Sequence, residues 1–179
     1  MLNYNLELDF KMKSNSPAKL FFYLIIILSL IEAAYFYNLL PERTAIHYNI
    51  KGQPDSWNSK TAIILINVGV VIFMALLFRV LIFFIRKIPE GLINLPNKYY
   101  WLAEIRKEET YEVINNFLFW TVDITLLFFV FLFYLIYQAN INHGASIAPD
   151  IWIVMIVYII ALSILTIKFY KHFNKVPGK

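Results

Sequence analysis

The sequence has no cysteine and few charged residues for its length. Without cysteine, the 179-residue chain has no disulfide framework, no cysteine-ligated iron–sulfur cluster and no thiolate zinc site. Charged residues make up 16% of the chain and apolar residues 60%, whereas soluble domains are about a quarter charged and about half apolar. The apolar residues are also gathered into long runs. Together these features predict an integral membrane protein.

The sequence also lacks the short motifs that mark common catalytic sites. It contains no HExxH pair, no phosphate-binding loop and no GxSxG motif. Ser29 and Ser163 lie inside apolar runs with no base near them in the sequence. The internal repeats and the spans interrupted by glycine or proline that are typical of transporters are missing too. We therefore predict that the protein is not an enzyme and uses no cofactor.

Four apolar runs are long enough to cross the hydrocarbon core of a membrane, which takes about 20 helical residues. They do not alternate as barrel strands do, so they are predicted to be helices. The first run is interpreted as a permanent span because no signal-peptide cleavage site follows its core. The predicted spans are residues 20–40, 61–85, 117–137 and 151–169, within a membrane domain at 19–179 that follows a cytoplasmic tail at 1–18.

The positions of lysine and arginine predict the orientation of these spans. Twelve of them lie in the two terminal tails and the loop between the second and third spans, against three in the other two loops. Positive residues are retained on the cytoplasmic side, so both termini are predicted to be cytoplasmic and residues 41–60 to lie outside. Topology and the lipid bilayer then account for the net charge of +4, and no nucleic-acid partner is predicted.

Residues 41–60 contain an unusual density of functional side chains for a connector between spans. Pro41 is expected to end the first helix, and the alternation at 45–50 weakly indicates extended structure. Gly52–Asp55 is interpreted as a turn, followed by a cap on the second helix from Asp55, Ser56 or Ser59. The loop is predicted either to form a simple lid or to be a recognition element. The candidate recognition residues are His47, Asn49, Gly52, Asp55, Trp57 and Lys60.

A metal site in the outer loops is a weaker interpretation of the same residues. His47, Asn49 and Asp55, with His143 from the second outer loop, are few and irregularly spaced. Zinc sites usually have three or four protein ligands at defined spacing. We therefore predict no metal ion.

Four polar residues are predicted to lie inside the membrane: Glu32, Asn67, Arg79 and Asp123. Ionisable groups at this depth are costly and are candidates for function. Arg79 and Asp123 both lie about 10 Å from the cytoplasmic boundary, so they are predicted to face each other, either as a structural ion pair or as part of a relay. Glu32 and Asn67 are predicted at a similar depth near the outer side of the membrane. Three roles are open for this pair: a hydrogen bond that packs the helices, a shared proton, or the floor of a pocket.

Two blocks of residues beside the spans carry a resemblance to a known family. The first comprises Leu40-Pro41, His47-Tyr48, Gly52, Asp55, Trp57 and Lys60, and the second runs from Leu95 to Leu102. They resemble a bacterial membrane domain of unknown function found at the N-terminus of SdpI-type immunity proteins, although many relatives have proline where this chain has Ala45. The resemblance implies a protein of the bacterial plasma membrane that protects against a secreted antimicrobial peptide and tethers a cytoplasmic regulator.

The sequence thus predicts an all-helical membrane protein with four transmembrane helices, cytoplasmic ends and a structured outer loop. The leading hypothesis is immunity to, or sensing of, a secreted peptide toxin through residues 41–60, with a cytoplasmic regulator as the second partner. The alternative is a small-solute or ion transporter that uses Glu32, Arg79 and Asp123. A membrane enzyme built on His47 and His143 is the third hypothesis.

Overall fold

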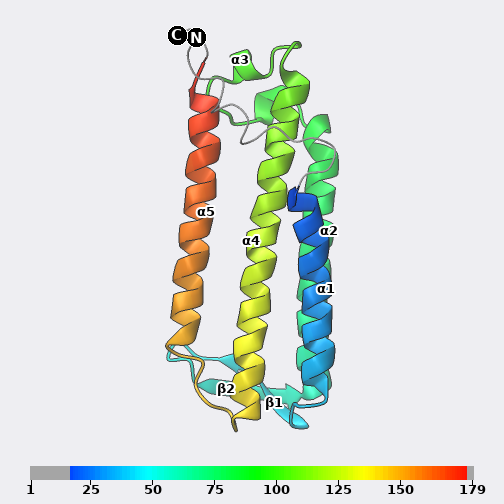
Figure 1. The fold of residues 1–179 in the computed structure, drawn as a ribbon, viewed down its shortest axis with the longest axis vertical. Helices are drawn as coiled ribbons and strands as arrows, with labels where there is room; N and C mark the ends of the chain where they lie inside the picture. Colours follow the sequence, from blue (N-terminus) through cyan, green and yellow to red (C-terminus); the bar gives the residue numbers. More distant parts are fainter. Residues whose placement is uncertain (1–16, 177–179) are drawn as a thin grey trace.

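The computed structural model describes residues 17–176, which form a bundle of long helices (Figure 1). The long helices are α1 (Pro17–Tyr37), α2 (Lys60–Phe84), α4 (Lys107–Ile141) and α5 (Asp150–Asn174). Each of these four is long and apolar enough to cross a membrane, and a helix satisfies its own backbone hydrogen bonds, as lipid requires. The chain is therefore a multi-pass helical membrane protein. The predicted tail at 1–18 lies outside the described residues, except for Pro17 and Ala18, which begin α1.

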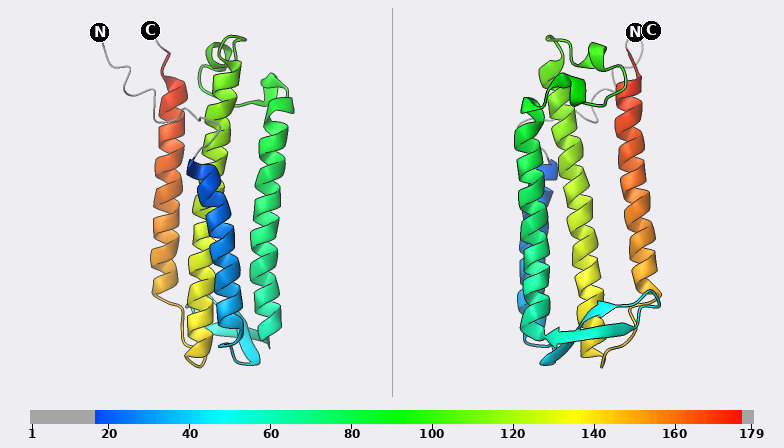
Figure 2. Two further views of the ribbon diagram at one scale, coloured as in Figure 1. Left: turned by 45° about the vertical axis from the view of Figure 1, so that its right-hand side comes forward. Right: turned by 180° about the vertical axis from the view of Figure 1, so that it is seen from behind.

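α4 is the central helix, and α1, α2 and α5 pack against it (Figures 1 and 2). α1 and α4 run in the same direction, since Phe22 contacts Phe119 at one level and Phe36 contacts Tyr137 further along. α4 has 35 residues, about 52 Å at ~1.5 Å per residue, which exceeds the roughly 30 Å of a hydrocarbon core. α4 therefore extends beyond the hydrocarbon core, and its first turn contains the charged residues Lys107, Glu108 and Glu109.

A β-hairpin lies across one end of the bundle, between α1 and α2 (Figure 1). Its strands are β1 (Arg43–Tyr48) and β2 (Pro54–Ser59), paired antiparallel. The extended structure predicted from the alternation at 45–50 is thus confirmed for residues 45–48, which belong to β1, whereas 49 and 50 belong to the turn. Ser59 caps α2, because its hydroxyl accepts a hydrogen bond from the backbone N–H of Ala62 at 3.2 Å.

The turn of this hairpin differs from the predicted one at Gly52–Asp55. The chain reverses between Asn49 and Gln53, and Pro54 and Asp55 already belong to β2. The physical reason is local: the Asn49 side-chain oxygen accepts hydrogen bonds from the N–H groups of Lys51 and Gln53, at 2.9 Å and 3.1 Å. An asparagine that bonds its own following backbone closes a turn in this way.

The connector between α2 and α4 covers the opposite end of the bundle (Figure 2). It contains two short 3-10 helices, η2 (Ile85–Lys87) and η3 (Glu90–Leu92), and one turn of α-helix, α3 (Lys98–Trp101). The hairpin and the loop before α5 therefore share one end of the bundle, and the connector and the last turn of α5 share the other. This arrangement groups the loops as the sequence predicted; which end faces the cytoplasm stays a prediction.

Candidate functional site

The hairpin is fixed to the bundle by one buried side chain of α4, Asn140. Its carbonyl oxygen accepts the N–H of Ala45 at 2.6 Å, and its amide nitrogen donates to the carbonyl oxygen of Ala45 at 3.0 Å. The same nitrogen also donates to the carbonyl oxygen of Ile136 at 2.9 Å. Asn140 is 4% exposed and Ala45 is fully buried. A buried backbone group needs a partner, and here Asn140 supplies it, so the hairpin has a defined position over α4.

Gly52 makes the second attachment, between the hairpin tip and the loop before α5. The carbonyl oxygen of Gly52 accepts a hydrogen bond from the N–H of Ile147 at 2.9 Å. Gly52 has a φ of +72°, and a Cβ at this position would lie 2.6 Å from the backbone nitrogen of Ala148. Both the positive φ and the close approach require glycine. The predicted recognition residue Gly52 is therefore a joint between the two loops at this end.

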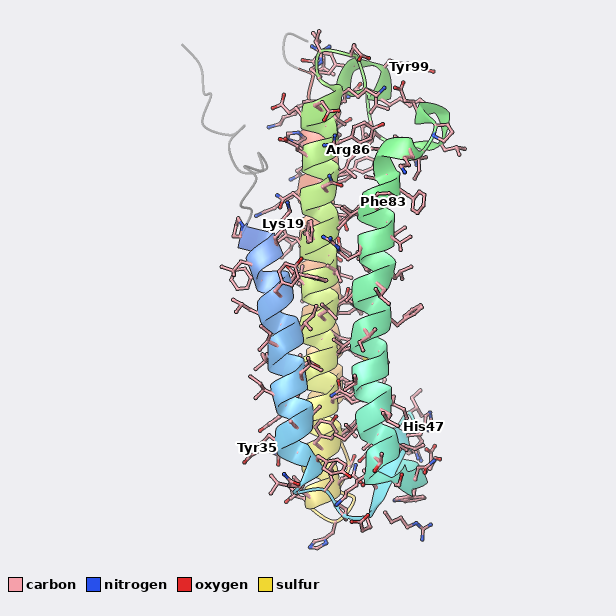
Figure 3. The ribbon with its side chains drawn as sticks, turned by 90° about the vertical axis from the view of Figure 1, so that its right-hand side faces the viewer. Lys19, Tyr35, His47, Phe83, Arg86 and Tyr99 are labelled. Atoms are coloured by element: carbon pink, nitrogen blue, oxygen red, sulfur yellow. The ribbon has the colours of Figure 1, made fainter. Side chains whose placement is uncertain are left out.

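His47 and Asp55 are brought together on the surface of the hairpin. Nδ1 of His47 lies 2.5 Å from Oδ1 of Asp55, and the two side chains are 67% and 41% exposed. Figure 3 shows His47 at the hairpin end, far from Arg86 and Tyr99 at the opposite end. An exposed pair of this kind contributes little to stability, so it is free to exchange its partner for a ligand group. The side chain of Asn49, in contrast, forms hydrogen bonds within the hairpin turn.

Trp57 and Lys60 lie on the second strand and at the start of α2. Trp57 pairs with Ala45 across the hairpin, is 44% exposed, and has the Arg43 guanidinium 5.8 Å from its ring centre. The Lys60 ammonium lies 2.9 Å from a Glu42 carboxylate oxygen and 5.0 Å from the centre of the Tyr37 ring. Lys60 therefore joins the ends of α1 and α2, whereas Trp57 presents an aromatic surface outward.

A groove of about 300 Å³ opens between β1, α4 and α5. Ile136 of α4 and Met155 of α5 contribute to its apolar walls, and His47 and Trp152 are among the residues that line it. Tyr48 also lines the groove, and burial raises the pKa of its hydroxyl to about 12, so the phenol stays neutral at physiological pH. The site thus combines an apolar groove with the exposed His47–Asp55 pair beside it.

Inside the bundle, Asn67 connects three helices. The Ser29 hydroxyl of α1 donates to the Asn67 side-chain oxygen at 3.1 Å, and the Asn67 amide donates to the Tyr137 hydroxyl of α4 at 2.7 Å. Glu32 and Asn67 were predicted at a similar depth, but no hydrogen bond joins these two described residues. Glu32 is 9% exposed, and its Oε2 has no hydrogen-bond partner within the described chain.

The predicted contact between Arg79 and Asp123 is wrong. Asp123 is 2% exposed, and neither of its oxygens has a hydrogen-bond partner among residues 17–176. Arg79 lies on the exposed face of α2, and no ion pair joins these two residues. Their depths were counted from the span ends, but depth does not determine the direction in which a helix presents a side chain. α2 is rotated so that Ile63, Asn67 and Val71 are its buried residues.

Asn140 and Tyr137 are functional-site residues that were not predicted from the sequence. Both were assigned to the end of the third span or to the loop after it, but α4 continues to Ile141 and buries them. A signal was present: an amide at the end of an apolar helix has to find hydrogen-bond partners when the helix continues. The hydrogen-bond partner of Asn140, the backbone of Ala45, is 95 residues away in sequence, and no local pattern reveals a partner at that distance.

These observations define a class: a helical multi-pass membrane protein with a β-hairpin fastened across one end. Residues 24–72 of this chain match the family model of a domain of unknown function, DUF1648. The matched segment contains most of α1, the whole hairpin and the first half of α2, and so includes the first block of residues on which the resemblance rests. No match was found among curated proteins or among solved structures.

Proposed function

We propose that this protein gives immunity to, or senses, a secreted antimicrobial peptide, and that the hairpin is its recognition element. In this proposal the hairpin end faces the outside of a bacterial plasma membrane and the connector end faces the cytoplasm. The role is non-enzymatic. The observation that carries the proposal is the exposed His47–Asp55 pair beside a groove of about 300 Å³ at a helix-bundle end.

The chemistry of the groove suits a membrane-active peptide. Such a peptide presents apolar side chains together with polar or charged groups, and it reaches the protein from the surface of the bilayer. Ile136 and Met155 supply apolar walls at the bundle end, and the pair of His47 and Asp55 offers both a donor and an acceptor. Trp57 is exposed and is of the residue type that most often anchors a protein interface.

Binding at the hairpin has a physical route to the other end through α5. The loop before α5 is tied to the hairpin by the hydrogen bond from Ile147 to Gly52. The last turn of α5 is held by the connector, since the Trp101 indole N–H donates to the carbonyl oxygen of Phe173 at 2.8 Å. A displacement of the hairpin would therefore be transmitted to the connector, where a cytoplasmic regulator is proposed to bind.

The immunity role is tested by survival of bacterial cells that express the chain during challenge with secreted peptides from its source. Wild type is expected to protect. His47→Ala and Asp55→Ala should each lower the protective effect at least tenfold, because each removes half of the exposed pair. His143→Asn is the matched control, since His143 is an exposed histidine at the same end whose positive φ of 58° is tolerated by asparagine.

Protection by wild type and by His143→Asn, lost in both hairpin variants at equal membrane levels, supports the proposal. Absence of protection against every peptide would contradict immunity. The transporter alternative predicts instead a solute or ion flux that depends on Glu32, Arg79 and Asp123.

A further inference from the structure

Glu32 occupies an unusual position for an acidic side chain. It lies in α1 with 9% of its surface exposed, and its Oε2 is fully buried without a hydrogen-bond partner among the described residues. An unpaired carboxylate at membrane depth is costly, so such a group either gains a positive partner or holds a proton. The groups around Glu32 decide between a positive partner and a proton.

A directed chain of hydrogen bonds ends beside this carboxyl group. Ser29 donates to Asn67, and Asn67 in turn donates to the hydroxyl oxygen of Tyr137, at 3.1 Å and 2.7 Å. The Tyr137 oxygen therefore acts as an acceptor toward Asn67, and its own hydrogen points elsewhere. Tyr137 is fully buried. Glu32 lies on the same face of α1 as Ser29 and Phe36, one turn from each, and the ring of Phe36 lies 5.0 Å from that of Tyr137. The chain thus places one O–H donor close to the buried carboxyl.

No described cation is paired with Glu32. From α2, the Lys60 ammonium lies near the end of α1 but is engaged by Glu42. From α4, the titratable groups near this part of α1 are Tyr134 and Tyr137, which contact Phe36. A metal cation is also a poor fit, because hard cations take six or more oxygen ligands, and the side-chain oxygen of Asn67 already accepts from Ser29. A proton is the one ligand that a single carboxyl group binds alone.

We propose that Glu32 is a reversible proton-binding site inside the membrane domain, and that Tyr137 donates a hydrogen bond to its ionised form. The proton comes from water and binds to a carboxylate oxygen of Glu32; on release it returns to water. Tyr137 keeps its own proton and only turns its O–H. Glu32 lies about 8 Å, at ~1.5 Å per residue, from the end of α1 below the hairpin, so exchange occurs from that end. This inference does not rest on the immunity role.

The test is an infrared pH titration of the protein in lipid nanodiscs, following the carbonyl band of protonated carboxylic acids. The band of Glu32 should be present at acidic pH, disappear as the pH rises, and be missing from Glu32→Gln. Asp123→Asn is the matched control, because Asp123 is the other buried carboxyl group without a hydrogen-bond partner among residues 17–176, and this variant should keep the Glu32 band. Tyr137→Phe should move the midpoint upward by about one pH unit, because the ionised form loses a donor.

A second readout is modification by dicyclohexylcarbodiimide, which reacts with protonated carboxyl groups in apolar surroundings. Mass spectrometry should find the label on Glu32 at pH values below the infrared midpoint and not above it. The proposal is overturned if the Glu32 band is absent at every pH, or if it persists unchanged across the range in which the protein stays folded. An unchanged midpoint in Tyr137→Phe would overturn the part assigned to Tyr137.

Discussion

Both ends of the bundle are closed by an asparagine that binds backbone far away in sequence, but the two asparagines differ in surroundings. At the hairpin end, Asn140 is buried and is bonded to both backbone groups of Ala45. At the connector end, Asn97 is exposed, and its amide donates to the carbonyl oxygens of Phe173 and Asn174, both at 3.1 Å. Asn140 makes its hydrogen bonds from a buried position, whereas Asn97 is exposed and shares the carbonyl oxygen of Phe173 with the indole N–H of Trp101.

The difference predicts how well each end of the bundle tolerates single substitutions. The hairpin is a small element whose second strand is almost entirely exposed. Ile46 and Tyr48 of β1 pack against the apolar cluster at this end but are only partly buried, so the position of the hairpin depends strongly on the buried hydrogen bonds of Asn140. The connector end has its own apolar cluster around Trp101, Tyr111 and Phe173, which would hold it together without Asn97. We therefore expect the hairpin end to be sensitive to single substitutions and the connector end to be robust.

Loss of the Asn140 side chain should have the largest effect. Asn140→Ala leaves the N–H and the carbonyl oxygen of Ala45 buried without their partner, and each such group costs about 1–3 kcal/mol. We expect a loss of about 3 kcal/mol in the free energy of unfolding, measured by chemical denaturation in detergent micelles, with faster proteolysis of the hairpin. Asn142→Ala, an exposed asparagine just past the end of α4, should change stability by less than about 0.5 kcal/mol. Equal effects of the two changes would contradict the assigned role.

Gly52→Ala should have the next largest effect. The new Cβ would be 2.6 Å from the Ala148 nitrogen, on a residue with a positive φ, so the hairpin tip has to separate from the loop before α5. We expect a loss of about 1–3 kcal/mol. Gly69→Ala is the control: a Cβ there meets nothing within 4 Å, and alanine in a helix is favoured by up to about 1 kcal/mol. Chemical denaturation in detergent micelles should therefore show changes of opposite sign in the free energy of unfolding for the two variants.

Trp101→Phe tests the connector end and should lower the free energy of unfolding by a smaller amount. It removes the indole N–H that donates to Phe173 at 2.8 Å. The carbonyl oxygen of Phe173 still accepts from Asn97, so no buried group is left without a partner, and the expected loss is about 1 kcal/mol. Tyr99→Phe, at a side chain that is 88% exposed, should be neutral in the same denaturation experiment. A loss as large as that of Asn140→Ala would remove the contrast between the ends.

The ion pair between Arg86 and Glu108 should make the smallest contribution to stability of the interactions considered. Its atoms lie 2.5 Å apart, but the two side chains are 44% and 74% exposed, and exposed pairs contribute about 0–1 kcal/mol. Glu108→Gln is therefore expected to lower the free energy of unfolding by less than about 1 kcal/mol. The difference from wild type should also shrink in high salt, because salt screens exposed charges.

Much of the fold could be predicted from the sequence because hydropathy reports directly on membrane spans. The second span was predicted at 61–85 and is found at Lys60–Phe84. The hairpin was predicted only in part. β1 buries Thr44 and Ala45 and exposes Arg43 and His47. β2 reads Pro-Asp-Ser-Trp-Asn-Ser and is nearly all exposed, so its sequence resembles a turn. Pairing with β1 is what makes it a strand.

The candidate site was harder to predict because it depends on long-range pairing and on helix rotation. His47 and Asp55 are eight residues apart and meet through a short hairpin, which local patterns can indicate. The rotation of α2, which exposes Arg79 and buries Asn67, follows from packing against α1 and α4. Hydropathy alone does not contain that information, so the depth of Arg79 and Asp123 could be estimated but their pairing could not.

The account requires the hairpin end to face the outside of the cell and the connector end to face the cytoplasm. The chain has no cysteine, so a single introduced cysteine reports its own position without background. Ser56→Cys in β2 and Tyr99→Cys in α3 both replace exposed residues and can be treated with a membrane-impermeant maleimide in intact bacterial cells. We predict labelling of Ser56→Cys in intact cells, and of Tyr99→Cys only after the cells are permeabilised. The reverse pattern would place the hairpin in the cytoplasm and contradict recognition of a secreted peptide.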